Sequence, residues 1–246
     1  ARESGKFNTT KTLPYEGTDT EFLGYIDTHS SSKILAMFND SKEVKELKEG
    51  DEAILVLDKS PFYAESGGQV GDSGCIKTKD AKFYVQDTIK IKKTVFGHIG
   101  VLETGSLKCN EEVEASIDEH RRDDIKRNHS VTHLLHKALK IVLGDHVEQK
   151  GSLVDNLKTR FDFSHTKPIS NDEIHKIESI VNNEILTNKV TSTKMMSIDK
   201  AKESGALMLF GEKYDSEVRV LNIGNSIELC GGTHVSNTGD IGLFKI

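Results

Sequence analysis

Three histidines lie close together in the stretch RNHSVTHLLH, at His129, His133 and His136. Residues 118–143 predict one helix, and on a wheel of about 100° per residue the three histidines share one face. The apolar stripe of this helix lies roughly opposite, which argues against core side chains, whereas Lys140 on the histidine face keeps a solvated surface open. Imidazoles one helical turn apart also suit a single zinc ion, which takes nitrogen ligands at about 2.0–2.1 Å.

A second pair of candidate ligands follows in ELCGGTHVSNTG, where Cys230 and His234 repeat the four-residue step at the end of a predicted strand. Gly231 and Gly232 between them permit a tight, left-handed turn that brings both side chains to one point. Alone, the cysteine is compatible with a small buried hydrophobe and the histidine with a loop residue. Together with the histidine pair on the helix, they favour a zinc site in the second half of the chain.

The first 117 residues predict a β architecture. Short strands separated by Gly, Asp, Asn and Ser favour a small antiparallel β-barrel, with a sandwich as the alternative. The predicted strands are 21–27, 33–38, 52–58, 82–88, 95–102 and 112–118.

Residues 118–246 predict an α+β domain, in which an antiparallel sheet carries two main helices. The helices are 118–143, followed by Gly144 as a C-terminal cap, and 170–188, where Ser170 and Glu173 form a capping box. The predicted strands are 146–154, 158–164, 189–196, 217–223, 226–230 and 241–246. We therefore expect two domains, 1–117 and 118–246, the second of them cut at its C-terminal end.

Composition narrows the class of protein. A formal net charge of −6 argues against a general polyanion binder, although a local basic surface is enough for nucleic acid. No run of about 18 apolar residues is present, so we expect no membrane span. Cys75, Cys109 and Cys230 are odd in number and far apart, which predicts free thiols and a cytoplasmic location. The chain lacks an initial Met and stops within a predicted strand, which predicts a piece of a longer protein.

Longer motifs surround the candidate ligands: NHSVTHLLHKAL, HVEQKGSLV, RFDFSH and CGGTHVSNTGDIGLFKI. Together they resemble the editing domain of the alanyl-tRNA synthetase family, in its bacterial form. PFYAESGGQVGDSG and HIGVLETGSL are similar to the β-barrel segment that precedes this domain. The resemblance runs from about Phe22 to the last residue. Related domains occur in freestanding AlaX-type deacylases and, more distantly, in threonyl-tRNA synthetase.

The resemblance implies hydrolysis of mischarged seryl- and glycyl-tRNA(Ala) at the aminoacyl ester, with a zinc-activated water. It implies Zn²⁺ as the cofactor and His129, His133, Cys230 and His234 as its ligands. Four protein ligands close a tetrahedron, whereas a catalytic zinc keeps one position open. We therefore expect three firm ligands plus water, with His129 or His234 the one that withdraws.

The implied partners are the acceptor end of tRNA(Ala) and the remainder of the synthetase chain, upstream and downstream. No segment resembles an ATP-binding adenylation site, so the ATP-dependent ligase activity is expected upstream of Ala1.

The resemblance also implies roles for side chains around the metal. Thr132 and Gln149 carry over as the catalytic candidates, Thr132 lining the pocket and Gln149 beside the substrate. Ordinary helix surface and an outward strand residue are the respective alternatives. Arg160 and Asp162 either support the pocket from behind or form a plain cross-strand ion pair. His136 has no metal role in the family and is assigned to the surface or to the surroundings of the ligands.

Candidate tRNA contacts come from two stretches. In ESGGQVGD, the residues Gly67, Gly68 and Gln69 favour a structural turn first, tRNA contact second and catalysis last. Basic residues near the histidines are candidate phosphate contacts, which would position the tRNA without reading its sequence. They are Arg121, Arg122, Lys126, Arg127, Lys150 and Lys158. The interleaved Asp123 and Asp124 keep a solvated helix start open as the alternative.

Two other functions remain open. The first is a freestanding AlaX-type trans-editing deacylase, which the length of the gene would distinguish. The second is a tRNA-binding module with a purely structural zinc. Removal of the metal separates this case, because loss of a structural zinc takes the fold with it.

Overall fold

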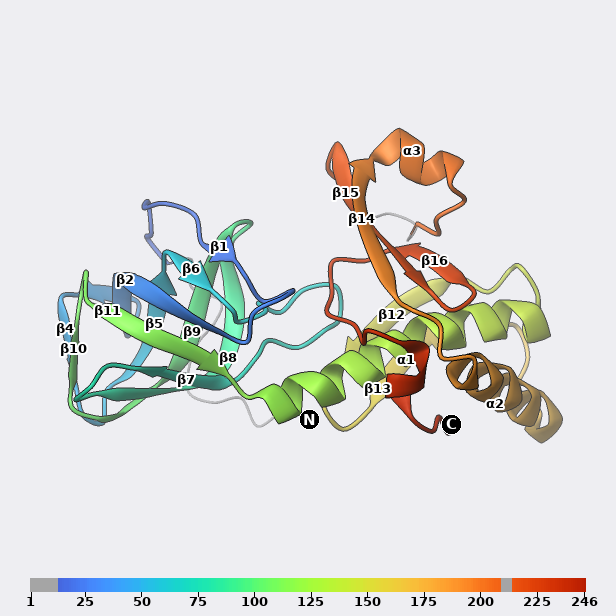
Figure 1. The fold of residues 1–246 in the computed structure, drawn as a ribbon, viewed down its shortest axis with the longest axis horizontal. Coiled ribbons are helices and arrows are strands. Elements are labelled where there is room, and N and C mark those ends of the chain that lie inside the picture. The colour runs from blue at the N-terminus through green and yellow to red at the C-terminus, as the bar shows by residue number, and fades with distance from the viewer. Residues whose placement is uncertain (1–12, 209–213) are drawn as a thin grey trace. The chain divides into compact units, whose positions relative to one another are not determined.

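Figure 1 shows the computed structural model, which describes residues 13–208 and 214–246. The chain divides into two compact units. The first comprises Ala1–Ser66 and Val70–Arg121, and the second comprises Gly67–Gln69 and Arg122–Ile246. Residues 1–12 of the predicted barrel domain lie outside the described residues.

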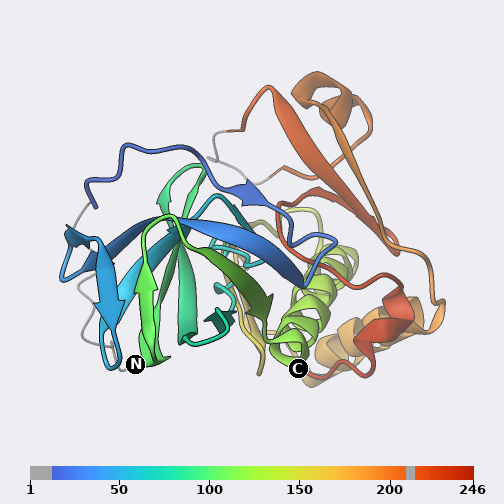
Figure 2. The ribbon, with the colours of Figure 1, turned by 60° about the vertical axis from the view of Figure 1, so that its left-hand side comes forward.

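The first unit is a closed antiparallel barrel, in the strand order β11, β7, β8, β9, β5 and β2, which Figure 2 shows curving round on itself. The barrel closes because β11 pairs with β2 as well as with β7. The barrel strands are β2 (His29–Asn39), β5 (Glu52–Leu57), β7 (Gly74–Lys77), β8 (Lys82–Lys92), β9 (Val95–Thr104) and β11 (Glu112–Ile117). The shorter strands are β1 (Glu21–Phe22), β3 (Lys42–Val44), β4 (Glu46–Lys48), β6 (Lys59–Ser60) and β10 (Ser106–Lys108). The antiparallel barrel predicted from the sequence is therefore confirmed.

The barrel interior follows from the period of two along its strands. Buried and exposed residues alternate in the first half of β2 and along most of β11, so that one face of each strand enters the core. β5 differs, because its residues after Glu52 are all buried. Leu55 and Leu57 belong to the main core cluster, while Ile54 and Val56 pack into a second cluster on the other face. A strand covered on both faces explains its continuous apolar sequence.

Two details of the barrel differ from the prediction. The strand expected at 21–27 is reduced to the two residues of β1, because the chain turns directly after Phe22. β7 was not predicted. It contains only four residues, Gly74–Lys77, and a short strand that begins with glycine has too few alternating positions to stand out.

The second unit has two main helices, α1 (Glu119–Leu143) and α2 (Asn171–Leu186), as predicted. α1 begins three residues before the boundary of this unit. The antiparallel sheet has the order β14, β15, β16, and β12 pairs with β13 as a separate hairpin. The remaining bounds are β12 (Gln149–Val154), β13 (Thr159–Phe163), β14 (Ser192–Ser197), α3 (Ile198–Glu203), β15 (Glu217–Ile223), β16 (Ser226–Leu229) and the 3-10 helix η1 (Thr238–Ile241).

The ends of the main helices have the predicted caps. α1 stops at Leu143, and Gly144 follows with a φ of 114°, a conformation that glycine adopts without strain. Ser170 and Glu173 form the complete capping box at the start of α2. Leu134 of α1 and Val181 of α2 belong to one buried cluster with Leu221 of β15, which fixes both helices to the sheet.

The strand predicted at 241–246 is wrong. η1 ends at Ile241, and the following segment is attached to α2 by a side chain. The amide of Asn182 donates to the carbonyl of Phe244 and accepts from its N–H, both at 2.9 Å. These bonds satisfy the backbone that a neighbouring strand would otherwise pair.

In the part of the chain that the structure describes, no helix is long and apolar enough to cross a bilayer.

Candidate metal centre

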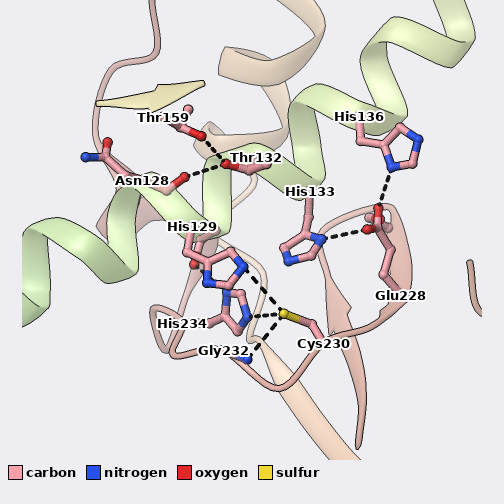
Figure 3. A network of polar contacts seen from close by, with 12 residues as sticks. Asn128, His129, Thr132, His133, His136, Thr159, Glu228, Cys230, Gly232 and His234 are labelled. Atoms are coloured by element: carbon pink, nitrogen blue, oxygen red, sulfur yellow. Dashed lines mark hydrogen bonds and ion pairs between the residues drawn. The ribbon is translucent and has the colours of Figure 1, made fainter. Parts of the chain in front are cut away.

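The second unit gathers His129, His133, Cys230 and His234 at one point, with one ligand atom from each lying within 4.8 Å of all the others. Figure 3 shows the two α1 histidines facing the segment that follows β16. The Sγ of Cys230 lies 3.2 Å from Nε2 of His234 and 3.5 Å from Nε2 of His129. The histidine face of α1 is buried, so the solvated surface left open by the sequence is excluded.

The turn after Cys230 is shaped by close approach. A Cβ on Gly232 would overlap the ring of His129, so only glycine fits at this position. Neither glycine of the turn has a positive φ, so the left-handed backbone that these glycines permit is not adopted. The Gly232 N–H donates to Sγ of Cys230 at 3.4 Å, while Arg219 donates to the carbonyls of Cys230 and Gly232, each at 2.9 Å. These bonds hold the thiol in position.

The three histidines of the cluster are His129, His133 and His234. In each of them, Nδ1 is held by a different residue outside the cluster. Nδ1 of His129 lies 2.7 Å from the amide oxygen of Gln69. Nδ1 of His133 lies 2.7 Å from a carboxylate oxygen of Glu228. Nδ1 of His234 lies 3.3 Å from the hydroxyl of Ser130. The Nε2 atoms are therefore the nitrogens that remain for the cluster, as in metal sites where a second residue fixes the tautomer of each ligand.

A further observation is consistent with a metal ion bound by these four residues. Nε2 of His133 is buried and has no hydrogen-bond partner within the described residues. Buried polar atoms almost always have a partner, because an unsatisfied one costs about 1–3 kcal/mol. Imidazole nitrogen and thiolate sulfur are both ligand types that zinc takes, usually four to a tetrahedron.

The charges of the cluster suit the same interpretation. Burial lowers the pKa of His133, but Glu228 and Cys230 outweigh burial and raise this pKa to about 10. Burial would raise the pKa of Glu228, yet the ion pair with His133 holds it well below its usual range. The neighbouring histidines likewise hold the pKa of the Cys230 thiol well below its ordinary value, and burial lowers the pKa of His234 to about 3. A thiolate and a neutral imidazole are thus available at neutral pH, whereas His133 would have to release a proton to bind a metal.

Glu228 and Gln69 take part in the site in ways that the sequence did not predict. Glu228 was not singled out at all, although Ser226 and Glu228 alternate with apolar residues along β16. For Gln69 the sequence favours a structural turn first. Its amide oxygen lies 2.7 Å from Nδ1 of His129 and also accepts from the N–H of Thr233 at 3.0 Å. Its NH₂ group donates to the Thr233 hydroxyl. Its amide is therefore used inside the site.

The turn that carries Gln69 also has structural requirements. Gly67 and Gly68 have φ values of 59° and 85°, in the left-handed region that favours glycine. A Cβ on Gly68 would lie 2.6 Å from the carbonyl oxygen of Ser152, too close for any other residue. Contact of this turn with tRNA stays a prediction.

His136 is buried, not on the surface, and it belongs to the surroundings of the ligands. Its Nδ1 lies 3.4 Å from the second carboxylate oxygen of Glu228, at ion-pair distance. Neither of its ring nitrogens forms a hydrogen bond with the described residues.

The hydrogen bonds of Thr132, the first of the two catalytic candidates, go to residues other than the four candidate ligands. The Thr132 hydroxyl donates to the carbonyl of Asn128 at 2.7 Å and lies 2.7 Å from the hydroxyl of Thr159. Gln149 is half-buried at the first position of β12. The other end of β12 approaches the site, where the Val154 N–H donates to Gly68. The catalytic roles of Thr132 and Gln149 stay predictions.

The remaining predicted residues have local partners. Arg160 and Asp162 form an exposed ion pair at 3.1 Å, but both lie on β13, so the pair is not the cross-strand one of the plain alternative. Arg121 donates to the carbonyl of Gly71, and Arg122 is buried. Lys126 pairs with Asp123 and Arg127 with Asp124, while Lys150 pairs with Glu148. The expected dilution of this basic stretch by acidic neighbours is thus present, and its contact with tRNA, Lys158 included, stays a prediction.

Comparison with known families gives two matches. Residues 2–121 match the tRNA synthetases class II (A) family, and residues 218–246 match the threonyl and alanyl tRNA synthetase second additional domain. The second match contains Cys230 and His234, whereas His129 and His133 lie outside both.

Curated proteins named alanine–tRNA ligase match the whole chain. The relative from Methylobacillus flagellatus is 57% identical over 246 residues, and the relatives from Delftia acidovorans and Aromatoleum aromaticum are 56% identical over the same length. In each case the match covers 100% of this chain and 28% of the relative. The chain therefore spans less than a third of the length of these relatives.

Proposed function

Because the chain belongs to the alanine–tRNA ligase family, we propose that it is the editing region of such an enzyme. In this proposal the segment 118–246 is an aminoacyl-tRNA deacylase domain and the barrel before it is a tRNA-contacting or linking domain. Its substrates are seryl- and glycyl-tRNA(Ala), its partner is the acceptor end of tRNA(Ala), and its products are the free amino acid and free tRNA. The surrounding protein is the ATP-dependent ligase, in the cytoplasm.

One observation carries the proposal: three imidazoles and a thiol converge, and each imidazole is oriented by a separate outer residue. Such outer partners are a regular feature of metal ligands. We propose Zn²⁺ as the ion, held by His129, His133, Cys230 and His234. Bound zinc supplies Lewis acidity, which lowers the pKa of water and polarises an ester carbonyl.

The chain itself holds this site in a fixed geometry. Gln69, Ser130 and Glu228 keep the imidazoles in place, and Arg219 holds the turn that carries Cys230. Elsewhere on α1, the hydroxyl of Thr132 lies 2.7 Å from that of Thr159, which links this helix to β13. Pre-oriented groups of this kind lower the barrier because little reorganisation is left for the reacting complex.

The need for a second site follows from the size of the amino acids. A pocket shaped for alanine does not exclude the smaller glycine, and it rejects serine only weakly, since serine merely adds a hydroxyl. A hydrolytic site that binds this hydroxyl distinguishes serine from alanine, because alanine leaves its polar groups unpaired. Gln149 is the side chain proposed to make this distinction.

The test is deacylation of seryl-tRNA(Ala) and alanyl-tRNA(Ala) by the purified chain, with and without a zinc chelator. We expect rapid release of serine and slow release of alanine, with the serine activity lost on chelation and recovered with added zinc. The far-ultraviolet circular dichroism should be retained after chelation. A folded, zinc-loaded protein that hydrolyses neither substrate would refute the deacylase assignment, and unfolding on chelation would favour a structural zinc.

A further inference from the structure

Glu228 is a carboxylate that β16 carries into the interior. Only 5% of the residue is exposed. Ser226 and Glu228 are both buried, while Ile227 and Leu229 between and after them are half-buried. Along a strand, positions two residues apart lie on the same face. β16 therefore directs two polar side chains together toward α1.

The two carboxylate oxygens of Glu228 have different partners, which Figure 3 shows in part. Oε2 lies 2.7 Å from Nδ1 of His133. Oε1 accepts from the hydroxyl of Ser226 at 2.8 Å and lies 3.4 Å from Nδ1 of His136. Glu228 is thus held from one side by Ser226 and holds His133 on the other.

From these contacts we propose that Glu228 is a positioning residue for His133. Its carboxylate accepts the Nδ1–H of the imidazole, which leaves Nε2 as the atom that faces Cys230, His129 and His234. A charge-assisted bond of this length also fixes the rotation of the ring. The inference rests on the metal-dependent function proposed above, and it assigns to this chain a determinant of metal affinity that is not itself a ligand.

His136 provides an internal control. It faces the same carboxylate through the other oxygen, and it is buried like His133. Its ring nitrogens are not among the four ligand atoms of the cluster. If Glu228 acts by orienting His133, loss of His136 leaves zinc binding largely intact. If Glu228 acts only by stabilising a buried polar group of residues, loss of His136 weakens zinc binding as well.

The test measures zinc affinity by competition with a chromophoric chelator, for Glu228→Gln beside His136→Asn. Glu217→Gln is the matched surface control, an exposed carboxylate on β15 of the same sheet. We expect Glu228→Gln to lose affinity by about 10- to 100-fold, the range found when outer partners of metal ligands are removed. His136→Asn and Glu217→Gln should bind zinc like the unaltered protein. The visible absorption of bound cobalt(II) should change in Glu228→Gln alone.

Ser226→Ala is the second test variant, for the case in which circular dichroism shows that Glu228→Gln does not fold. It removes the bond that holds Oε1, so it should reduce zinc affinity in the same direction and by less. Unchanged affinity in a folded Glu228→Gln or, if that variant unfolds, in Ser226→Ala would overturn the positioning role. An equal loss in His136→Asn would overturn it too. An unaltered protein that binds no zinc would instead sink the proposed function from which the inference starts.

Discussion

His98 in the barrel and His133 on α1 are both buried histidines, 0% and 7% exposed, yet their nitrogens are used differently. In the barrel, Nδ1 of His98 lies 3.0 Å from the carbonyl of Leu55, and Nε2 lies 2.7 Å from the hydroxyl of Ser60. Since a carbonyl only accepts, Nδ1 of His98 carries the proton and Nε2 accepts from Ser60. Both nitrogens are satisfied within the barrel, so His98 has no lone pair left for a metal.

His133 has the opposite arrangement. Its Nδ1 is held by Glu228, and its Nε2 faces three other ligand atoms without a hydrogen-bond partner among the described residues. The electrostatics differ accordingly: burial lowers the pKa of His98 to about 4, whereas Glu228 and Cys230 outweigh burial at His133. Burial therefore does not identify a ligand histidine. The partner of each nitrogen does.

The largest effect on zinc binding is expected when a cysteine is replaced in the metal cluster, and none is expected when a cysteine is replaced in the barrel. Cys230→Ala removes a proposed ligand and should lower zinc affinity by more than about 100-fold, beyond the range for outer partners of ligands. Release of serine from seryl-tRNA(Ala) should fall to the uncatalysed rate. Cys75→Ala is the matched control, a free half-buried thiol on β7 of the barrel, and it should change neither quantity. Equal zinc content in both variants would contradict the assignment of the cluster.

His98→Ala should produce the converse result, a loss of stability without a loss of zinc. The variant leaves a cavity and deprives Leu55 and Ser60 of their partner, which together cost roughly 2–4 kcal/mol. Denaturant unfolding measures the change, followed through the near-ultraviolet signal of the tyrosines, since four of the five tyrosines, Tyr15, Tyr25, Tyr63 and Tyr84, lie in the first unit. A barrel as stable as before, or a loss of bound zinc, would break the comparison.

Acid should weaken the barrel through the same histidine. The pKa of His98 is depressed to about 4 in the folded state, so between its unfolded value of about 6.5 and that pH the unfolded chain binds the extra proton. The stabilising contribution is thus complete above about pH 6.5 and is lost as the pH falls toward 4, up to about 3 kcal/mol. Unfolding free energies across this range, for the unaltered protein and for His98→Gln, measure it. The same slope in both proteins would exclude His98 as the cause.

The smallest effect is expected at the longest of the three bonds to an outer residue. Ser130→Ala removes the hydroxyl that lies 3.3 Å from Nδ1 of His234. The same hydroxyl accepts from the N–H of Val235. A long bond to a neutral group orients less strongly than the 2.7 Å bond from Glu228 to His133. Zinc affinity should fall by less than about 10-fold, the lower end of the range for such partners. A loss as great as that of Glu228→Gln would remove the proposed order among the three partners.

The two halves of the His/Cys cluster could be predicted from the sequence because each half lies within one short segment. His129 and His133 are one helical turn apart, and Cys230 and His234 flank a two-glycine turn, so local geometry alone brings each pair together. The residues that orient them come from elsewhere. Gln69 precedes His129 by 60 residues, and no local pattern connects the two.

Glu228 and the C-terminal segment illustrate the limits of strand patterns. Ser226 and Glu228 alternate with apolar residues, a pattern typical of polar side chains that face solvent. In the structure both polar residues are buried instead. Ser226 and His133 form hydrogen bonds with the carboxylate of Glu228 there. The apolar segment 241–246 is not a strand, because the side chain of Asn182 binds its backbone. The barrel was easier to predict, because short strands separated by Gly, Asp, Asn and Ser recur along the first 117 residues.

X-ray absorption at the zinc edge of the zinc-loaded protein tests the metal assignment most directly. The account predicts one sulfur at about 2.3 Å together with nitrogen or oxygen neighbours at about 2.0–2.1 Å. The sulfur contribution should vanish in Cys230→Ala and persist in Cys75→Ala. A zinc environment without sulfur in the unaltered protein, or one that Cys230→Ala leaves unchanged, would contradict the assignment of this cluster as the metal centre.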